Sequence, residues 1–285
     1  MWGLSFPAIS VGLEYLPPLL FAAFRYDVAA ALLLVYVAVT TDEWLPHARN
    51  DLEAVAGGGI FLVAGNGLLF IGQQTVPSGV AAILQALVPI LTVLWALGLL
   101  GERLSGVGAV GVALGLLGVG LIVQPDLNNL LAGDTAGRLI ILGQVVSVSL
   151  GGVLVDRAAP SMERVAMTGW AMLLGGIVLH LLSLGAGETA PATIPTPVAL
   201  GAVVYLGVFS TALAFVIYFT ILEKRGAFET SLVAYLVPVV ATIAGAVLLG
   251  ESVGLLTLTG FLVVFVGFAL LKRHALVELV AAGVS

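Results

Sequence analysis

The chain has 285 residues, of which 60% are hydrophobic and only 9% are charged. A soluble domain of that length needs far more charge to cover its surface, so the composition excludes a water-soluble fold and indicates a protein solvated by lipid. A net charge of −6 without a basic stripe argues against nucleic-acid binding, and the absence of cysteine from the sequence excludes disulfides and thiolate metal sites.

Ten apolar segments separated by short polar loops account for nearly the whole chain, which predicts an all-α polytopic membrane protein. The predicted helices cover, in chain order, 1–13, 17–39, 54–73, 76–100, 106–123, 136–155, 162–184, 198–222, 227–249 and 253–271. Prolines mark several of the junctions, as expected where a helix must end. Little of the chain is left for a soluble domain.

The first segment is shorter than the others. Only about 13 apolar residues precede Glu14, and at about 1.5 Å per residue they reach roughly 20 Å, less than a hydrocarbon core of roughly 30 Å. Two interpretations are open, a half-span or a natural start upstream of Met1, and the second is favoured. The segment has no basic region and no small-residue cleavage site, so it is not predicted to be a removable signal peptide.

The basic residues predict the orientation of the chain. If both termini are cytoplasmic, Arg138 is in an outside loop and Arg25 is within a helix. The other eight of the ten basic residues then fall on the cytoplasmic side: Arg49, Arg103, Arg157, Arg164, Lys224, Arg225, Lys272 and Arg273. Because Lys and Arg are enriched in cytoplasmic loops, the sequence predicts a multi-pass protein of the cell membrane with both termini in the cytoplasm.

An internal repeat relates the two halves at a constant offset of 149 residues. Leu-Val-Pro at 87–89 recurs at 236–238, and Leu-Leu-Gly-Glu at 99–102 recurs at 248–251. Two glycines keep the same offset, Gly111 with Gly260 and Gly118 with Gly267. Chance similarity between apolar segments explains leucines more readily than this combination of proline, Gly-Glu and glycine.

The repeat unit contains five helices, an odd number, so the second copy must enter the membrane upside down. The predicted organisation is an N-terminal repeat at 1–125 with a truncated first helix, a C-terminal repeat at 134–272 and a cytoplasmic tail at 273–285. Inverted repeats are a recurrent construction among secondary transporters, where two exchangeable halves permit alternating access. A duplication without consequence for transport is the alternative.

Three motifs occur in order along the chain: Trp-Gly-Leu-Ser-Phe at 2–6, Leu-Pro-Pro at 16–18 followed by Ala-Phe-Arg-Tyr at 23–26, and the paired Pro and Leu-Leu-Gly-Glu segments. With these motifs the chain resembles the drug/metabolite transporter superfamily, in its EamA-like branch, over essentially its whole length. The resemblance implies ten helices in two inverted halves and the export or exchange of amino acids, metabolites or drugs. In that family the first motif lies well inside the first helix, which agrees with a truncated start.

Polar side chains recur along one face of several predicted helices, a pattern that a lipid-facing stripe does not tolerate. These faces are expected to point inward and to line a mostly neutral cavity for a small amphipathic solute. The alternative is interhelical hydrogen bonding that only holds the bundle together, and for the set as a whole the cavity is favoured. The candidate cavity residues are Trp2, Asn66, Gln85, Gln144, Ser147, Tyr218 and Tyr235.

Pro89 and Pro238 lie near the middle of the helices predicted at 76–100 and 227–249. Proline removes a backbone hydrogen bond and kinks a helix. The two residues are therefore either hinges at the floor of a central cavity or sources of simple curvature, and neither interpretation is favoured.

Arg25 and Asp27 are ionisable residues inside a predicted span, where each costs about 2.5–3.5 kcal/mol on insertion scales. Two positions apart on a helix, they project to different sides and do not pair well with each other. Arg25 either attracts a substrate carboxylate or extends to the outer surface. Asp27 either couples transport to protons or faces a watery crevice. The structural interpretation is slightly favoured for both.

Three classes of function compete. A primary, ATP-driven pump is excluded for this chain alone, because its sequence has no GxxxxGK[ST] loop to bind the nucleotide. An intramembrane enzyme would need paired catalytic groups on facing helices, and His47, His180 and His274 do not supply them, so no catalysis, cofactor or metal site is expected. A scaffold would not need polar inward faces. The sequence therefore predicts a secondary transporter or exporter of small metabolites, amino acids or drug-like solutes.

The predicted partners are a small-molecule substrate and the lipid bilayer, with no nucleic acid. Coupling to protons, coupling to sodium and exchange all stay open as the driving force. The Gly111-x-x-x-Gly115 motif permits close helix contact. That contact is made either within the bundle, which is favoured, or between two copies in a homodimer.

Overall fold

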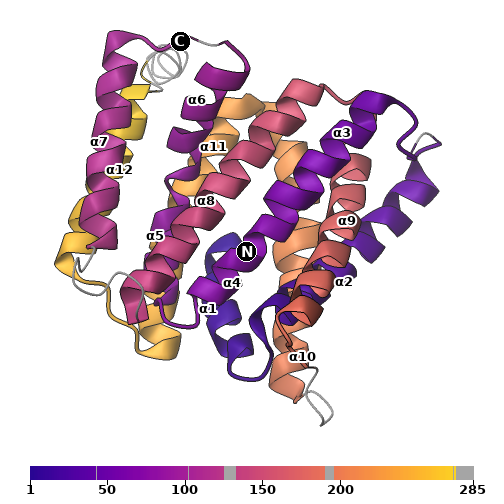
Figure 1. Cartoon of the computed structure of the whole chain (residues 1–285), viewed down its shortest axis with the longest axis horizontal. Coiled ribbons are helices and arrows are strands. Elements are labelled where there is room, and N and C mark those ends of the chain that lie inside the picture. The colour runs from indigo at the N-terminus through magenta and orange to yellow at the C-terminus, as the bar shows by residue number, and fades with distance from the viewer. Residues whose placement is uncertain (43, 102, 125–132, 190–195, 272, 274–285) are drawn as a thin grey trace.

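The computed structural model describes residues 1–42, 44–101, 103–124, 133–189, 196–271 and 273, and for residues 225–235 it describes the backbone alone. The regular structure in these ranges is helical (Figure 1). Within them, 7 helices are long and apolar enough to cross a membrane, and three shorter apolar helices accompany them. The prediction of an all-α, polytopic membrane protein is thereby confirmed.

The helices begin and end close to the predicted boundaries, and the helix predicted at 106–123 has the same bounds in the structure. In chain order they are α1 (Trp2–Leu13), α2 (Pro18–Thr40), α3 (Arg49–Gly57), η1 (Gly58–Val63), η2 (Ala64–Asn66), α4 (Gly67–Gly72), α5 (Ser78–Gln85), α6 (Val88–Leu99), α7 (Gly106–Val123), α8 (Gly133–Ala158), α9 (Arg164–Gly185), α10 (Pro197–Val204), η3 (Tyr205–Leu213), α11 (Ala214–Leu249) and α12 (Leu255–Leu271). The first helix is short, as predicted.

Several predicted spans consist of more than one helical piece. Pro89 has no N–H to bond the Gln85 carbonyl, and accordingly α5 ends at Gln85 and α6 begins at Val88. Pro238, in contrast, stays inside α11. The segments η1 and η3 are π-helical, a wide winding that is rare and frequently found at functional sites.

The sequence predicted two helices where α11 is continuous. Helical backbone runs from Ala214 to Leu249, so the loop predicted between 222 and 227 is wrong as secondary structure. A straight helix would separate Tyr218 from Val240 by about 33 Å. The ring centroid of Trp2 is nevertheless 5.3 Å from that of Tyr218, while a Cβ on the adjacent Gly3 would lie 2.6 Å from Val240. α11 therefore bends back on itself, and its two ends run as separate passes.

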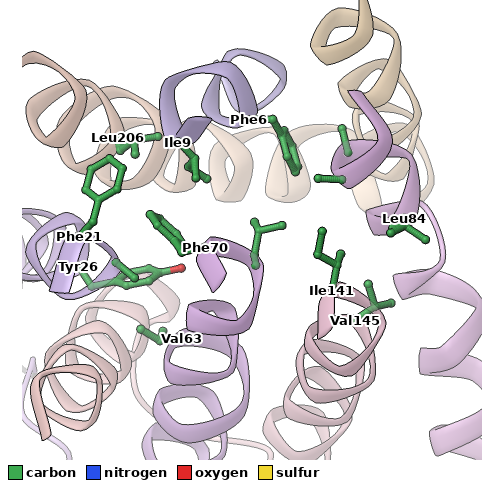
Figure 2. Close-up of a cluster of buried hydrophobic side chains, with 14 of the residues drawn as sticks. Phe6, Ile9, Phe21, Tyr26, Val63, Phe70, Leu84, Ile141, Val145 and Leu206 are labelled. Atoms are coloured by element: carbon green, nitrogen blue, oxygen red, sulfur yellow. The ribbon is translucent and has the colours of Figure 1, made fainter. Parts of the chain in front are cut away.

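The core joins helices that are far apart in the sequence. Phe21 of α2 packs edge-to-face on Phe70 of α4, with ring centroids 5.2 Å apart. Figure 2 shows Ile9 of α1 and Leu206 of η3 near these rings. The same buried cluster extends across the view to Phe6 of α1, Leu84 of α5, and Ile141 and Val145 of α8. In lipid this close packing, rather than exclusion of water, provides much of the attraction between helices.

Carboxylates connect helices at both ends of the bundle, named here the Arg164 end and the Glu251 end. At the Arg164 end, the buried Asp51 Oδ1 accepts hydrogen bonds from the backbone N–H of Ser161 (2.7 Å) and Met162 (3.1 Å), just before α9. At the Glu251 end, Glu251 Oε2 accepts from the Ser78 N–H (2.9 Å) and hydroxyl (2.5 Å), at the start of α5. Such acceptors satisfy N–H groups that lack a partner inside the helix.

The helices α7 and α12 pack side by side at one edge of the molecule (Figure 1). A Cβ on Gly111 would lie 2.5 Å from the Gly267 carbonyl oxygen, and a Cβ on Gly118 would lie 2.8 Å from that of Gly260, so the two helices are antiparallel and in backbone contact. The glycine face that includes the Gly111-x-x-x-Gly115 motif is thus used inside the bundle. Arg103 precedes α7 and Ser252 precedes α12, which places these two residues at opposite ends.

Candidate functional site

A cavity of about 430 Å³ lies between the helices of the two halves. It is framed by pieces of eight passes, with the two ends of α11 counted separately, and these contribute both apolar and polar side chains. The lining residues are Trp2, Ser5, Phe6, Ile9, Arg25, Tyr26, Leu62, Val63, Asn66, Leu69, Gln85, Val88, Gln144, Val148, Met172, Phe215, Tyr218 and Val237.

The structure brings together most of the residues that the sequence suggested for a cavity. Five of the seven candidates line it: Trp2, Asn66, Gln85, Gln144 and Tyr218. Ser147 does not line it, because its hydroxyl donates to the Phe61 carbonyl in η1 (2.9 Å). The side chain of Tyr235 lies outside the described residues. Val88 and Val237, which precede Pro89 and Pro238, also line the cavity.

A row of hydrogen bonds crosses the cavity wall from one half of the chain to the other. Gln85 Nε2 donates to Gln144 Oε1, and Gln144 Nε2 donates to Asn66 Oδ1 at 3.0 Å. Asn66 Nδ2 in turn donates to the Tyr26 hydroxyl at 2.6 Å. The row links α5, α8, η2 and α2. Side-chain amides offer both donors and acceptors, so this wall can exchange its internal bonds for bonds to a solute.

Aromatic rings form a second part of the wall. The indole of Trp2 lies 5.7 Å from the Phe215 ring and 5.3 Å from the Tyr218 ring, measured between centroids. The Trp2 Nε1–H donates to the Ser210 carbonyl in η3 (3.0 Å), which fixes the orientation of the indole. Such rings present large, rigid apolar faces to a ligand.

Arg25 points into the bundle and does not extend to the outer surface. The residue is 7% exposed, and its Nε donates to the Thr211 hydroxyl at 2.8 Å. Its guanidinium carbon lies 5.2 Å from the Tyr26 ring centroid and 6.0 Å from that of Phe70, within the range of a cation–π interaction. The interpretation of Arg25 as a surface-seeking side chain is therefore wrong.

Asp27 lies outside this cavity. Its Oδ2 is 2.7 Å from His180 Nε2 on α9, and both side chains are partly exposed on the side of the bundle. As expected, Asp27 does not pair with Arg25. No pattern in the sequence connects Asp27 to His180, which is 153 residues away.

The cavity continues toward the Arg164 end and is closed toward the Glu251 end. A second hollow of about 570 Å³ shares Leu62, Val63, Met172, Phe215 and Tyr218 with the first, and its other lining residues include Asp156, Pro160, Met162 and Arg164. On the opposite side, Gln73 Nε2 donates to the Phe6 carbonyl (3.0 Å) and to the Ser10 hydroxyl (3.1 Å). Among the described residues, the cavity is thus continuous with a hollow at the Arg164 end and separated from the Glu251 end by these contacts of Gln73.

The sequence did not identify several lining residues, for two different reasons. Tyr26 was part of a recognised motif, and its hydroxyl, unusual inside an apolar span, was a signal that it faces other helices. Phe6, Leu62 and Met172 carry no such signal because an apolar side chain is equally suited to lipid, to the core and to a cavity wall.

A bundle of apolar helices that encloses a partly polar cavity is the arrangement expected of a membrane transport protein. The model of the EamA-like transporter family matches residues 1–124 and 135–273. The chain belongs to this family, which confirms the resemblance seen in its motifs and the prediction of a multi-pass membrane transporter.

Related proteins have similar lengths and are named as transporters. The "Uncharacterized inner membrane transporter YedA" of Escherichia coli strain K12 is 32% identical over 88% of this chain and 80% of its own. An "Uncharacterized transporter" of Archaeoglobus fulgidus is 29% identical over 95% of both chains. A "Probable amino-acid metabolite efflux pump" of Salmonella typhimurium is 25% identical over 94% of this chain and 89% of its own.

The fold is shared with solved structures, one of which is a crystal structure that matches nearly the whole chain. It superposes with a TM-score of 0.64 and 21% sequence identity, and the match covers 96% of this chain and 97% of the other.

Proposed function

We propose that the protein is a secondary transporter that moves a small metabolite, amino acid or drug-like solute by alternating access. The observation that carries the proposal is the cavity itself, which both halves of the chain line and which continues into a hollow at the Arg164 end. A solute bound in the cavity would become exposed at the Glu251 end if the two halves exchanged conformations.

Contacts between α7 and α12 support two inverted repeats, at 1–125 and 134–272. The offset of 149 maps Gly111 onto Gly260 and Gly118 onto Gly267. If the two repeats are exchanged by this offset, Gly111 takes the place of Gly260 and Gly267 that of Gly118. The contact between Gly111 and Gly267 then corresponds to the contact between Gly260 and Gly118, and both contacts occur. Reciprocal contacts of this kind are the mark of a two-fold axis.

The π-helical segments support the same relation. The offset maps Gly58–Val63 of η1 into η3, and it maps Phe61 onto Ser210. Each of these two carbonyls accepts a hydrogen bond from the first helix of the opposite half, from Ser147 at 2.9 Å and from Trp2 at 3.0 Å. With α7 and α12, this favours ten passes in two antiparallel copies.

The positions of the basic residues favour a cytoplasmic Arg164 end. Arg49 lies there near Asp51, Arg103 lies just before α7, and Arg164 begins α9. Arg138, in contrast, lies at the opposite end, where it donates to the Ile122 carbonyl near the end of α7 (2.6 Å). By the positive-inside rule, the cavity then faces the cytoplasm, and α12 ends on the cytoplasmic side.

Filling the cavity is expected to stop transport without unfolding the protein. Val148→Trp places a large ring in the cavity, and we expect exchange of the transported solute to fall about tenfold or more. The measurement is counterflow into proteoliposomes, with a panel of labelled amino acids and small organic acids.

Val146→Trp is the matched control, because Val146 lies two residues away on α8 and is 41% exposed on its outer side. This variant should transport normally. Counterflow that never exceeds the protein-free background, or that is equal in the wild type and in Val148→Trp, would contradict the proposed function.

A further inference from the structure

Arg25 leaves part of its guanidinium available inside the cavity. Its Nε is bonded to Thr211, but its two terminal amino groups have no hydrogen-bond partner among the described side chains and backbone. The residue is nevertheless 93% buried, being 7% exposed. Arginine stays protonated in proteins, so a positive charge with free donors faces the space where a solute would sit.

Among the described residues that line the cavity, no carboxylate balances this charge. Of the described residues that line it, Arg25 is the one charged side chain, and none is acidic. The nearby Asp27 is bonded to His180 instead. A buried charge without a partner is costly in a surrounding of low polarity, and an anion that enters the cavity would offset that cost.

The rest of the cavity suits an uncharged, partly aromatic body. The rings of Trp2, Phe215 and Tyr218 give a broad apolar face. The amides of Gln85, Gln144 and Asn66 are neutral and can bond a hydroxyl or carbonyl. An ammonium group, in contrast, would find no carboxylate among the described lining residues and would lie in the field of Arg25.

We propose that the cavity selects amphipathic monoanions. The carboxylate of the solute is bound by the free amino groups of Arg25, and the apolar part of the solute packs against the rings of Trp2, Phe215 and Tyr218. The proposal deepens the proposed function by naming the charge class of its solute. It predicts that a monocarboxylate binds more tightly than a zwitterion or a cation of the same shape. Charge-assisted bonds to guanidinium are also the strong, directional ones.

Three probes of nearly equal size test the charge preference: 3-phenylpropanoate, phenylalanine and phenethylamine. Equilibrium binding is measured by calorimetry on the purified full chain in detergent. We expect 3-phenylpropanoate to bind about ten- to a hundredfold more tightly than phenethylamine, which lacks the charge-assisted bonds to the guanidinium. It should also bind more tightly than phenylalanine, whose ammonium would be buried near Arg25 without a carboxylate partner. Equal or tighter binding of phenylalanine or phenethylamine, or no detectable binding of 3-phenylpropanoate, would overturn the proposal.

Variants locate the effect at Arg25. Arg25→Gln should remove the preference for the anion, whereas Arg25→Lys, which keeps the charge but not the planar donor pair, should retain it in weaker form. Thr211→Val removes the bond to Nε and keeps the guanidinium, so it should leave the order of the three probes unchanged. If Arg25→Gln does not fold, the order of the probes on the wild type and on Arg25→Lys still decides.

Flux is measured separately, with 3-phenylpropanoate in proteoliposomes. Binding that depends on Arg25 without any flux would contradict the transporter function and leave the anion site standing. Flux of phenylalanine or phenethylamine in preference to the anion would leave the transporter function standing and contradict the anion site.

Discussion

A disulfide between Ser78→Cys and Gly245→Cys is expected to abolish transport reversibly. A Cβ on Gly245 would lie 2.6 Å from the Ser78 hydroxyl oxygen, so two cysteines there can meet with the short Cβ separation that a disulfide needs. The bond would join α5 to α11, which belong to different repeats, at the closed Glu251 end. If that end must open in each cycle, the oxidised variant should lose about tenfold or more of its counterflow activity, and a reductant should restore it.

The single variants Ser78→Cys and Gly245→Cys, oxidised in the same way, control for loss of contacts with Glu251. The natural chain contains no cysteine, so no other disulfide can form within it. Normal transport by the oxidised 78–245 pair, with the cross-link verified by mass spectrometry, would contradict alternating access at this end.

A leucine at Gly118 is expected to destabilise the protein strongly. A Cβ there would lie 2.8 Å from the Gly260 carbonyl oxygen, which is backbone and cannot move away as a side chain can. Overpacking of this kind costs about 1–3 kcal/mol or more. The α7–α12 pair must separate to admit the side chain, so Gly118→Leu should lower the apparent melting temperature in detergent and reduce the yield of monodisperse protein.

Gly120→Leu is the control on the same helix, because a Cβ on Gly120 meets no atom within 4 Å. It should leave stability unchanged or raise it slightly, since glycine is a poor helix former. Equal melting temperatures for Gly118→Leu and Gly120→Leu would show that α7 and α12 do not pack through their glycine faces.

Much of the fold could be predicted because lipid imposes simple rules. Apolar runs predicted where helices begin and end, and α7 was predicted to the residue. The expense of polar groups in a membrane directed attention to Gln85, Gln144 and Asn66, which do line one cavity. The predicted loop after residue 222 was wrong because no proline stops the helix there, and α11 bends without losing its helical backbone.

Details of the site depended on contacts between distant residues. Ser147 shares a helix face with Gln144, yet its hydroxyl bonds the Phe61 carbonyl in a π-helical segment that hydropathy does not reveal. The direction of Arg25 depends on Thr211, which lies 186 residues away. Periodicity places a side chain on a face of its own helix but does not say which neighbour that face meets.

The inverted arrangement of the two halves is tested most directly by labelling single cysteines from either side of the membrane. Arg103 and Ser252 follow equivalent Leu-Leu-Gly-Glu segments and lie at opposite ends of the bundle. A membrane-impermeant maleimide should label Arg103→Cys only from the cytoplasmic side and Ser252→Cys only from the outside, in membrane vesicles of known orientation. Labelling of both positions from the same side would contradict the antiparallel halves, and with them the proposed mechanism of alternating access.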